Sequence, residues 1–195
     1  MRSDRISSAL RQRVTRQFRS VTTAPERYAA PVEILDGPGV EAKPERHTAG
    51  IRVVTPFRGM FAVRDKLMDE LYTWLDARDL TYGPTLFRLH VVDMEADMDV
   101  EVAVILDDPV KGDDRVTAGI LPAGDYAFLK YVNHGLRANK TLLEWVRTQN
   151  LALDVEESPA GDRFASRYEA YLTDPRTERM KTRWQIELAV RLAQT

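Results

Sequence analysis

The sequence predicts an α+β fold in which two tandem βαββ modules, related by a pseudo-twofold axis, form one curved antiparallel sheet. The helices lie on one face of this sheet, and a ligand cleft lies on the other. Three observations predict this fold: a helix end that occurs twice, strand-like segments in the same order around both copies, and enough apolar residues for a core. The chain has 195 residues, of which 44% are hydrophobic, so it can bury a sizeable core.

The repeated helix end reads "LYTWLDARDL" at residues 71–80 and "LLEWVRTQNL" at residues 142–151. Four apolar positions match at a constant spacing of 71 residues (142 − 71), in the pairs Leu71/Leu142, Trp74/Trp145, Leu75/Val146 and Leu80/Leu151. Large aromatic residues near the end of an amphipathic helix usually pack in the core. We therefore expect both tryptophans to be core residues.

The same order of elements surrounds both copies. The first module is expected to contain a strand at 49–57, a helix at 60–78, and strands at 85–93 and 99–106. The second repeats this order, with a strand at 124–132, a helix at 137–149, and strands at 163–172 and 184–192. A βαββ unit leaves one sheet face uncovered, so two units are expected to pair, which leaves a concave surface opposite the helices.

Composition divides the chain into a tail and a body. Residues 21–39 are rich in proline and glycine, which is typical of a linker, so the body is expected at 40–195 with modules at about 40–110 and 111–195. The first twenty residues hold six arginines and one aspartate around an apolar stripe of Ile6, Leu10, Val14 and Phe18. Residues 1–39 are thus predicted to be a basic amphipathic helix followed by a linker.

This basic helix has several possible roles. It can dock on the body of its own chain, on a second copy or on a protein partner, while contact with nucleic acid or a membrane and a transit peptide are alternatives. About 39 residues are too few for a multi-helix DNA-reading domain, so we do not expect a conventional transcription factor.

Whole-chain composition narrows the chemistry. The 28 basic and 30 acidic residues are balanced, and there is no cysteine, which removes disulfides, thiolate zinc sites and cysteine nucleophiles and suits the cytoplasm. The three histidines are far apart, so we predict no metal and no cofactor. No apolar run has the length of a membrane span.

Strand alternation assigns side chains to the two faces of the sheet. The residues expected under the helices are Phe87, Leu89, Val91, Phe164, Tyr168, Leu172, Ile186, Leu188 and Val190. The polar residues expected in the cleft are Arg88, His90, Glu101, Arg167, Glu169, Tyr171, Gln185 and Glu187.

The body resembles a known family, the GyrI-like small-molecule-binding domain. The segments that carry the resemblance are "GIRVVTPF", "YGPTLFRLHVVD", "DVEVAVIL", "LPAGDYAFLKYVNHG", "LLEWV", "RYEAYLTDP" and "WQIELAVRL", in that order. The domain senses effectors in many AraC- and MerR-type bacterial regulators and also occurs alone. The resemblance implies a ligand pocket with a glutamate at its base.

The family pattern W-x-T-E-[IV]-x-x-P assigns that glutamate to Glu187, with Trp184 at its first position. Ile186 replaces the threonine and Arg191 the proline. A tyrosine often expected in the strand at 85–93 is Leu89, and an "HGPY"-like turn reads "HGLR". The candidate ligand-binding residues are Glu187, Tyr171, Tyr131, His90, Arg88 and Glu101.

A carboxylate in a partly apolar cleft needs compensation. A cationic ligand can neutralise Glu187, Glu187 can keep a raised pKa and exchange protons, or it can pair with Arg88 or Arg167 in a structural role. Tyr171 and Tyr131 would offer ring faces to a flat or cationic ligand.

Three functions follow as hypotheses. The first is a receptor for a hydrophobic, aromatic or cationic small molecule. The second, which the resemblance implies for some stand-alone members, is a hydrolase of strained cyclopropane-containing natural products, in which Glu187 activates water or stabilises positive charge. The third is nucleic-acid binding through the arginine-rich helix, which the acidic body does not favour.

Overall fold

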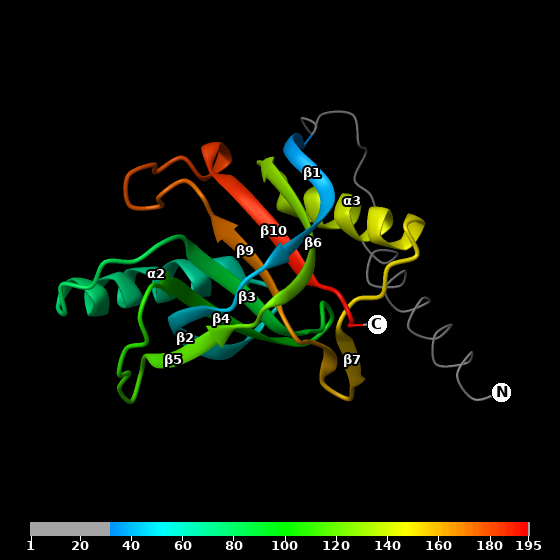
Figure 1. Ribbon diagram of the computed structural model, residues 1–195. Helices are drawn as coiled ribbons and strands as arrows, with labels where there is room; N and C mark the ends of the chain where they lie inside the picture. Colours follow the sequence, from blue (N-terminus) through cyan, green and yellow to red (C-terminus); the bar gives the residue numbers. More distant parts are fainter. Residues whose placement is uncertain (1–31, 195) are drawn as a thin grey trace. The chain divides into compact units, whose positions relative to one another are not determined.

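The computed structural model describes residues 32–194, which form one ten-stranded sheet with two α-helices (Figure 1). The predicted basic helix lies outside the described residues. The elements of the first half are β1 Glu33–Lys43, β2 Arg46–Pro56, α2 Met60–Asp76, β3 Thr85–Val92, β4 Asp97–Leu106 and β5 Thr117–Leu121. Those of the second half are β6 Gly124–Val132, α3 Gly135–Thr148, β7 Val155–Ser158, β8 Gly161–Phe164, β9 Arg167–Tyr171, a 3-10 turn Lys181–Arg183 and β10 Gln185–Arg191.

The strand order is symmetric about the β9–β3 pair. The order across the sheet is β1-β6-β10-β9-β3-β4-β2-β5, and these neighbours pair antiparallel. Outward from the centre, each module presents its second, third and first strand: β3, β4, β2 on one side and β9, β10, β6 on the other. The fold predicted from the sequence, two βαββ modules in one curved antiparallel sheet, is confirmed.

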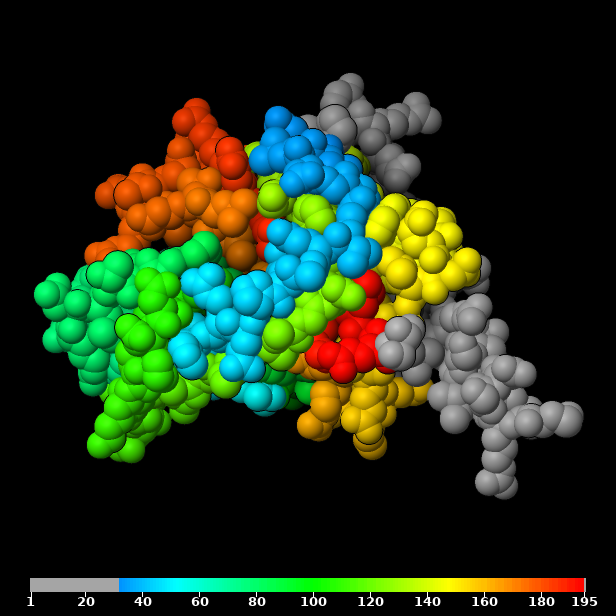
Figure 2. Space-filling view, viewed as in Figure 1, coloured from blue at the N-terminus to red at the C-terminus, as the bar shows by residue number. Residues whose placement is uncertain are grey.

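The outermost strands are exchanged between the modules. β1 precedes the first module but pairs with β6 of the second, and β5 precedes the second module but pairs with β2 of the first. Only Pro44 and Glu45 join β1 to β2, and only Pro122 and Ala123 join β5 to β6. Such short links bring the two ends of the sheet close together, so the sheet curls. Figure 2 shows the β1–β2 segment, in blue and cyan, crossing the front of the molecule.

The sequence repeat marks equivalent helix ends. At each end one residue is left-handed, Asp79 with φ 51° and Asn150 with φ 55°, again 71 positions apart (150 − 79). The amide of the next residue bonds five residues back, Leu80 to Leu75 at 3.2 Å and Leu151 to Val146 at 3.1 Å. Asp and Asn tolerate this conformation better than other non-glycine residues, so the same stop signal ends both helices.

The sheet has two buried faces, each with its own core. The helical face packs against α2 and α3, and its core includes Ile51, Leu71, Phe87, Val102, Leu129, Leu142, Ile186 and Leu188. Trp74 is buried in this core and Trp145 packs against it, as predicted. The inner face, on the opposite side, has a smaller core of Leu86, Ala103, Leu121, Tyr126, Tyr168, Ala170 and Ala189. Because the sheet curls around the inner face, side chains there are buried without a covering helix.

Two predictions of local structure were wrong. Residues 33–39 were assigned to the linker, but they form the first part of β1. β1 is an edge strand, so it can contain the Gly37–Pro38–Gly39 segment, where its pairing with β6 is irregular. The strand predicted at 163–172 is two strands, β8 and β9, interrupted at Ala165 and Ser166.

Neither α2 nor α3, the helices of the described residues, has the length and apolarity that crossing a bilayer would require.

Candidate functional site

The predicted site residues lie on two different faces of the sheet. In the pairing of β10 with β9, Glu187 lies opposite Ala170, whereas Ile186 lies opposite Tyr171. Ile186 also lies opposite Tyr131 of β6. Glu187 therefore points to the inner face, as predicted, while Tyr171 and Tyr131 belong to the helical-face core. The prediction that these tyrosines share a cleft with Glu187 was wrong.

The error arose because the two faces of β9 were assigned the wrong way round. Tyr168 was assigned to the helix side but belongs to the inner-face core, and Arg167, Glu169 and Tyr171 share the opposite, helical face. β9 is a central strand that is covered on both sides. Apolar alternation shows which residues share a face of such a strand, but not which face has the helices.

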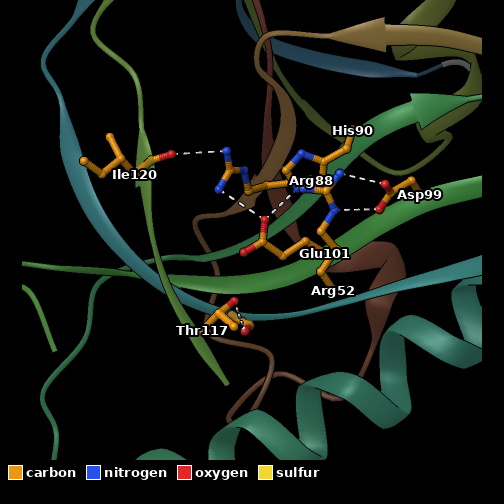
Figure 3. Close-up of polar contacts among 8 residues, drawn as sticks. Arg52, Arg88, His90, Asp99, Glu101, Thr117 and Ile120 are labelled. Atoms are coloured by element: carbon orange, nitrogen blue, oxygen red, sulfur yellow. Dashed lines mark hydrogen bonds and ion pairs between the residues drawn. The ribbon is translucent and has the colours of Figure 1, made fainter. Parts of the chain in front are cut away.

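Three of the predicted residues meet on the inner face. Glu101 of β4 is 5% exposed; it accepts a hydrogen bond from His90 at 2.7 Å and pairs with Arg88 at 3.2 Å (Figure 3). Arg88 also donates to the carbonyl of Ile120 at 3.2 Å. Although burial opposes the effect, the His90 hydrogen bond and the Arg88 charge hold the pKa of Glu101 below its usual value. Glu101 is thus a charged, fully partnered carboxylate.

Glu187 also has a partner within the chain. Lys43 of β1 lies 2.9 Å from Glu187 and 2.7 Å from Glu41. The possible structural pairs with Arg88 or Arg167 are not formed, because Arg88 binds Glu101 and Arg167 lies on the helical face. The inner face therefore holds compensated ion pairs, the arrangement typical of structural networks.

A second polar group, which we term the Glu169 cluster, lies on the helical face where the modules meet. It consists of Arg64 from α2, Tyr131 from β6, Asn139 from α3, and Arg167, Glu169 and Tyr171 from β9. Tyr131 Oη donates to Glu169 Oε1 at 3.1 Å, and Asn139 Nδ2 approaches the same oxygen at 3.4 Å. Arg167 donates to Asn139 at 2.8 Å, and Arg64 donates to Tyr171 at 3.1 Å. Tyr131, Glu169, Asn139 and Arg167 are thus joined by hydrogen bonds, and Arg64 of the first module acts on Glu169 through its charge.

Gly135, the first residue of α3, permits this close approach. A Cβ at this position would lie 2.9 Å from Tyr131 Oη and 3.5 Å from Glu169 Oε1. The glycine of the "HGLR" turn is therefore required where the helix begins over the carboxyl group. Glu169, Asn139 and Gly135 are all half-buried, so the cluster reaches solvent beside the start of α3.

The electrostatics of the Glu169 cluster differ from those of the inner face. Burial raises the pKa of Glu169, against the hydrogen bond from Tyr131 and the charges of Arg64 and Arg167. Burial also raises the pKa of Tyr131 and of Tyr171 and lowers that of Arg167 to about 10. At neutral pH both arginines are charged, both tyrosines are neutral, and Glu169 is the carboxyl group whose charge is disfavoured. Such a perturbed group is a candidate functional residue.

Glu169→Gln should make the protein more stable at high pH. A folded-state pKa above the unfolded value means that the protonated form favours folding, so this contribution is present at low pH and is lost as pH rises through the folded-state pKa. We expect similar melting temperatures near pH 4. Near pH 8 the variant should melt higher by about 2–4 °C, the shift that about 1 kcal/mol produces in a domain of this size. Thermal unfolding of both proteins at the two pH values measures this. A variant that melts lower than the wild type at pH 8 would contradict the assignment.

Sequence reasoning missed Arg64 and Asn139 and placed Glu169 on the wrong face. A signal for Arg64 was present, because it follows Met60 by four residues and precedes Leu67 by three, in the middle of the apolar stripe of α2. An arginine at such a position must be buried with a partner.

Among residues 32–194, no group of three or more histidine, aspartate or glutamate side chains could hold a metal ion.

The fold has relatives among solved structures. The C-terminal domain of EcmrR superposes with a TM-score of 0.59 at 19% identity over 80% of this chain and 97% of that one. EcmrR in a complex with DNA gives 0.63 at 18% identity over 98% of this chain and 64% of that one. A hydrolase from Listeria innocua gives 0.53 at 13% identity over 94% and 98% of the two chains. At these identities the likeness shows the fold alone.

No curated protein matches the chain significantly. The model of a protein family, the GyrI-like small molecule binding domain, matches residues 38–193. This range contains both modules, the inner face and the Glu169 cluster. The chain therefore belongs to the GyrI-like small-molecule-binding domain family.

Proposed function

We propose that the protein is a receptor for an aromatic or otherwise apolar small molecule, which binds at the Glu169 cluster. The observation that carries the proposal is the half-buried Glu169, whose pKa is raised by burial and which accepts hydrogen bonds from Tyr131 of β6 and Asn139 of α3. Small-molecule sites are mostly apolar, with a few converging polar groups and perturbed titratable residues. The buried rings of Tyr131 and Tyr171 beside Glu169 fit this description.

The inner face is the alternative location, with Glu187 at the base of the site as the family resemblance implies. Its carboxylate already pairs with Lys43, and a ligand that used it would have to compete with that lysine. Glu169 has no lysine or arginine within ion-pair distance among residues 32–194 that would have to be displaced. We therefore favour Glu169.

Glu169→Gln and Glu187→Gln form a matched pair that tests this choice. With 1-naphthalenemethanol as the probe in isothermal titration, Glu169→Gln should weaken binding about tenfold, because a hydrogen bond to an ionisable group contributes about 1–3 kcal/mol. Glu187→Gln should leave the affinity within about twofold, a negligible free-energy change. The reverse pattern would move the site to the inner face. Mass spectrometry of the purified protein, for a small molecule released on denaturation, identifies the natural ligand.

A hydrolase is the second candidate function. A glutamate whose pKa is raised by burial can stay protonated and act as a general acid, and Tyr131 Oη orients the carboxyl group. The substrate class would be the strained cyclopropane-containing natural products that the family resemblance implies. Glu169→Gln should then abolish turnover while substrate binding persists, whereas a receptor shows no turnover in either protein.

A further inference from the structure

Arg64 occupies an aromatic cage, which we define by the rings of Phe61, Phe87, Tyr171 and Trp184. The Cζ atom of its guanidinium lies 5.0, 5.9, 5.6 and 5.8 Å from the four ring centroids, in that order. Rings at these distances attract a cation, and proteins use such cages to bind cationic ligands. Here the cation comes from the chain itself.

Arg64 is held firmly in this position. It is 6% exposed; its Nη1 donates to Tyr171 at 3.1 Å, and its Nε and Nη2 donate to Asp65 at 3.1 and 2.7 Å. Lys181 binds the other carboxylate oxygen of Asp65. A ligand cation that displaced Arg64 would break these bonds and leave a buried charge without partners, which is costly.

Arg167 brings a second guanidinium to the same face of β9. It is 6% exposed, and its Nη2 donates to Asn139 of the Glu169 cluster at 2.8 Å. Its Nε and Nη1 are buried and have no hydrogen-bond partner among residues 32–194. The ring of Phe164, at 4.8 Å from Cζ, covers part of the guanidinium but accepts no such bond. A buried guanidinium with two open donors is suited to bind a carboxylate, whose two oxygens match its geometry.

The buried charges of the cluster therefore favour an anion. Arg64 and Arg167 are both cationic, and the charges of both act on the carboxyl group of Glu169. Asp65 already neutralises Arg64. Arg167 feels the carboxyl groups of Glu169 and Asp162, but two of its donors are open, so a further cation would meet a like charge there and an anion would meet an opposite one.

We propose that the Glu169 cluster takes an aromatic ligand that bears an anionic group such as a carboxylate. Arg167 binds the anionic group, and Arg64, as the resident occupant of the aromatic cage, excludes aromatic cations. This inference rests on the proposed function, because it assigns the chemical class of the ligand at the same site.

Three naphthalene probes of the same shape and different charge test the inference on the full chain at pH 7. They are naphthalene-1-acetate, 1-naphthylmethylammonium and the neutral 1-naphthalenemethanol, titrated calorimetrically. We expect the anion to bind at least tenfold more tightly than the cation, with the alcohol between them. An equal or higher affinity for the cation would overturn the inference but leave the receptor proposal standing. A chain that bound none of the three would count against both.

Two variants separate charge recognition from packing. Arg167→Gln should lower the affinity for naphthalene-1-acetate at least tenfold and leave that for 1-naphthalenemethanol within about threefold, since it removes a charge-assisted contact. Arg64→Met keeps most of the side-chain volume and should raise the affinity for the cation by removing the resident charge. Arg78→Gln is the matched control, because Arg78 stacks on Trp74 at 4.0 Å, outside the cluster; it should change nothing. An equal loss for all three probes in Arg167→Gln would show that Arg167 acts through packing and would overturn the inference.

Discussion

Leu142→Ala and Leu71→Ala should each lower the free energy of unfolding by about 2–5 kcal/mol, the usual effect of a fully buried leucine truncation. Both side chains are 0% exposed. They occupy equivalent positions of α3 and α2 and pack in the same helical-face core. If the modules are true equivalents, the two losses should be similar. Urea unfolding of each variant measures them.

Leu136→Ala is the control for this pair. Leu136 also lies in α3 but is 52% exposed, so its truncation should change the free energy of unfolding by no more than about 0.5 kcal/mol. A loss below about 1 kcal/mol for either buried leucine would contradict the assignment of its helix to the shared core.

Gly50→Ala should destabilise the protein by about 1–3 kcal/mol through overpacking. A Cβ at Gly50 would lie 2.5 Å from Glu101 Oε1, 2.7 Å from Ala103 Cβ and 2.8 Å from the Val102 carbonyl oxygen. The last contact is with backbone, so a side-chain rotation cannot relieve the strain. The substitution would also push Glu101 away from its partners, and stability should fall in urea unfolding.

Gly83→Ala provides the comparison, because the nearest atoms to a Cβ there lie at 3.6 Å, an ordinary contact distance. We expect its stability to stay within about 0.5 kcal/mol of the wild type. Equal stability of the Gly50→Ala variant would mean that β2 and β4 are not as closely apposed on the inner face as described.

The sequence predicted the fold well because the repeated elements have a strong and simple signal. The helices carry apolar residues at helical spacing, and both end with a left-handed residue, Asp79 or Asn150, followed by a leucine. In β10 the apolar residues Ile186 and Leu188 are separated by the charged Glu187. This alternation was enough to show which side chains face the helices and which face the other side of the sheet. Pro38 in β1 had the opposite effect, since proline is usual in linkers and uncommon in strands.

The site was harder to predict, because its charged residues lie on a buried face of β9 where the alternation of polar and apolar residues predicts exposure. Glu169 and Arg167 alternate with Tyr168 and Ala170 in β9, so polarity alone suggests that the charged side is away from the core. The structure instead buries these charges under α3, where Asn139 connects them. Polar groups that are buried against helices depend on partners far away in the sequence. The periodicity of apolar residues along one strand or helix does not reveal those partners.

The central claim is that the ligand binds on the helical face at Glu169, not on the inner face at Glu187. The most direct measurement is a crystal structure of the chain with whichever naphthalene probe binds most tightly. We expect density for the ring beside Tyr131 and Glu169, between residues contributed by α2 and α3. Density on the inner face, against Glu187 and Tyr168, would contradict it.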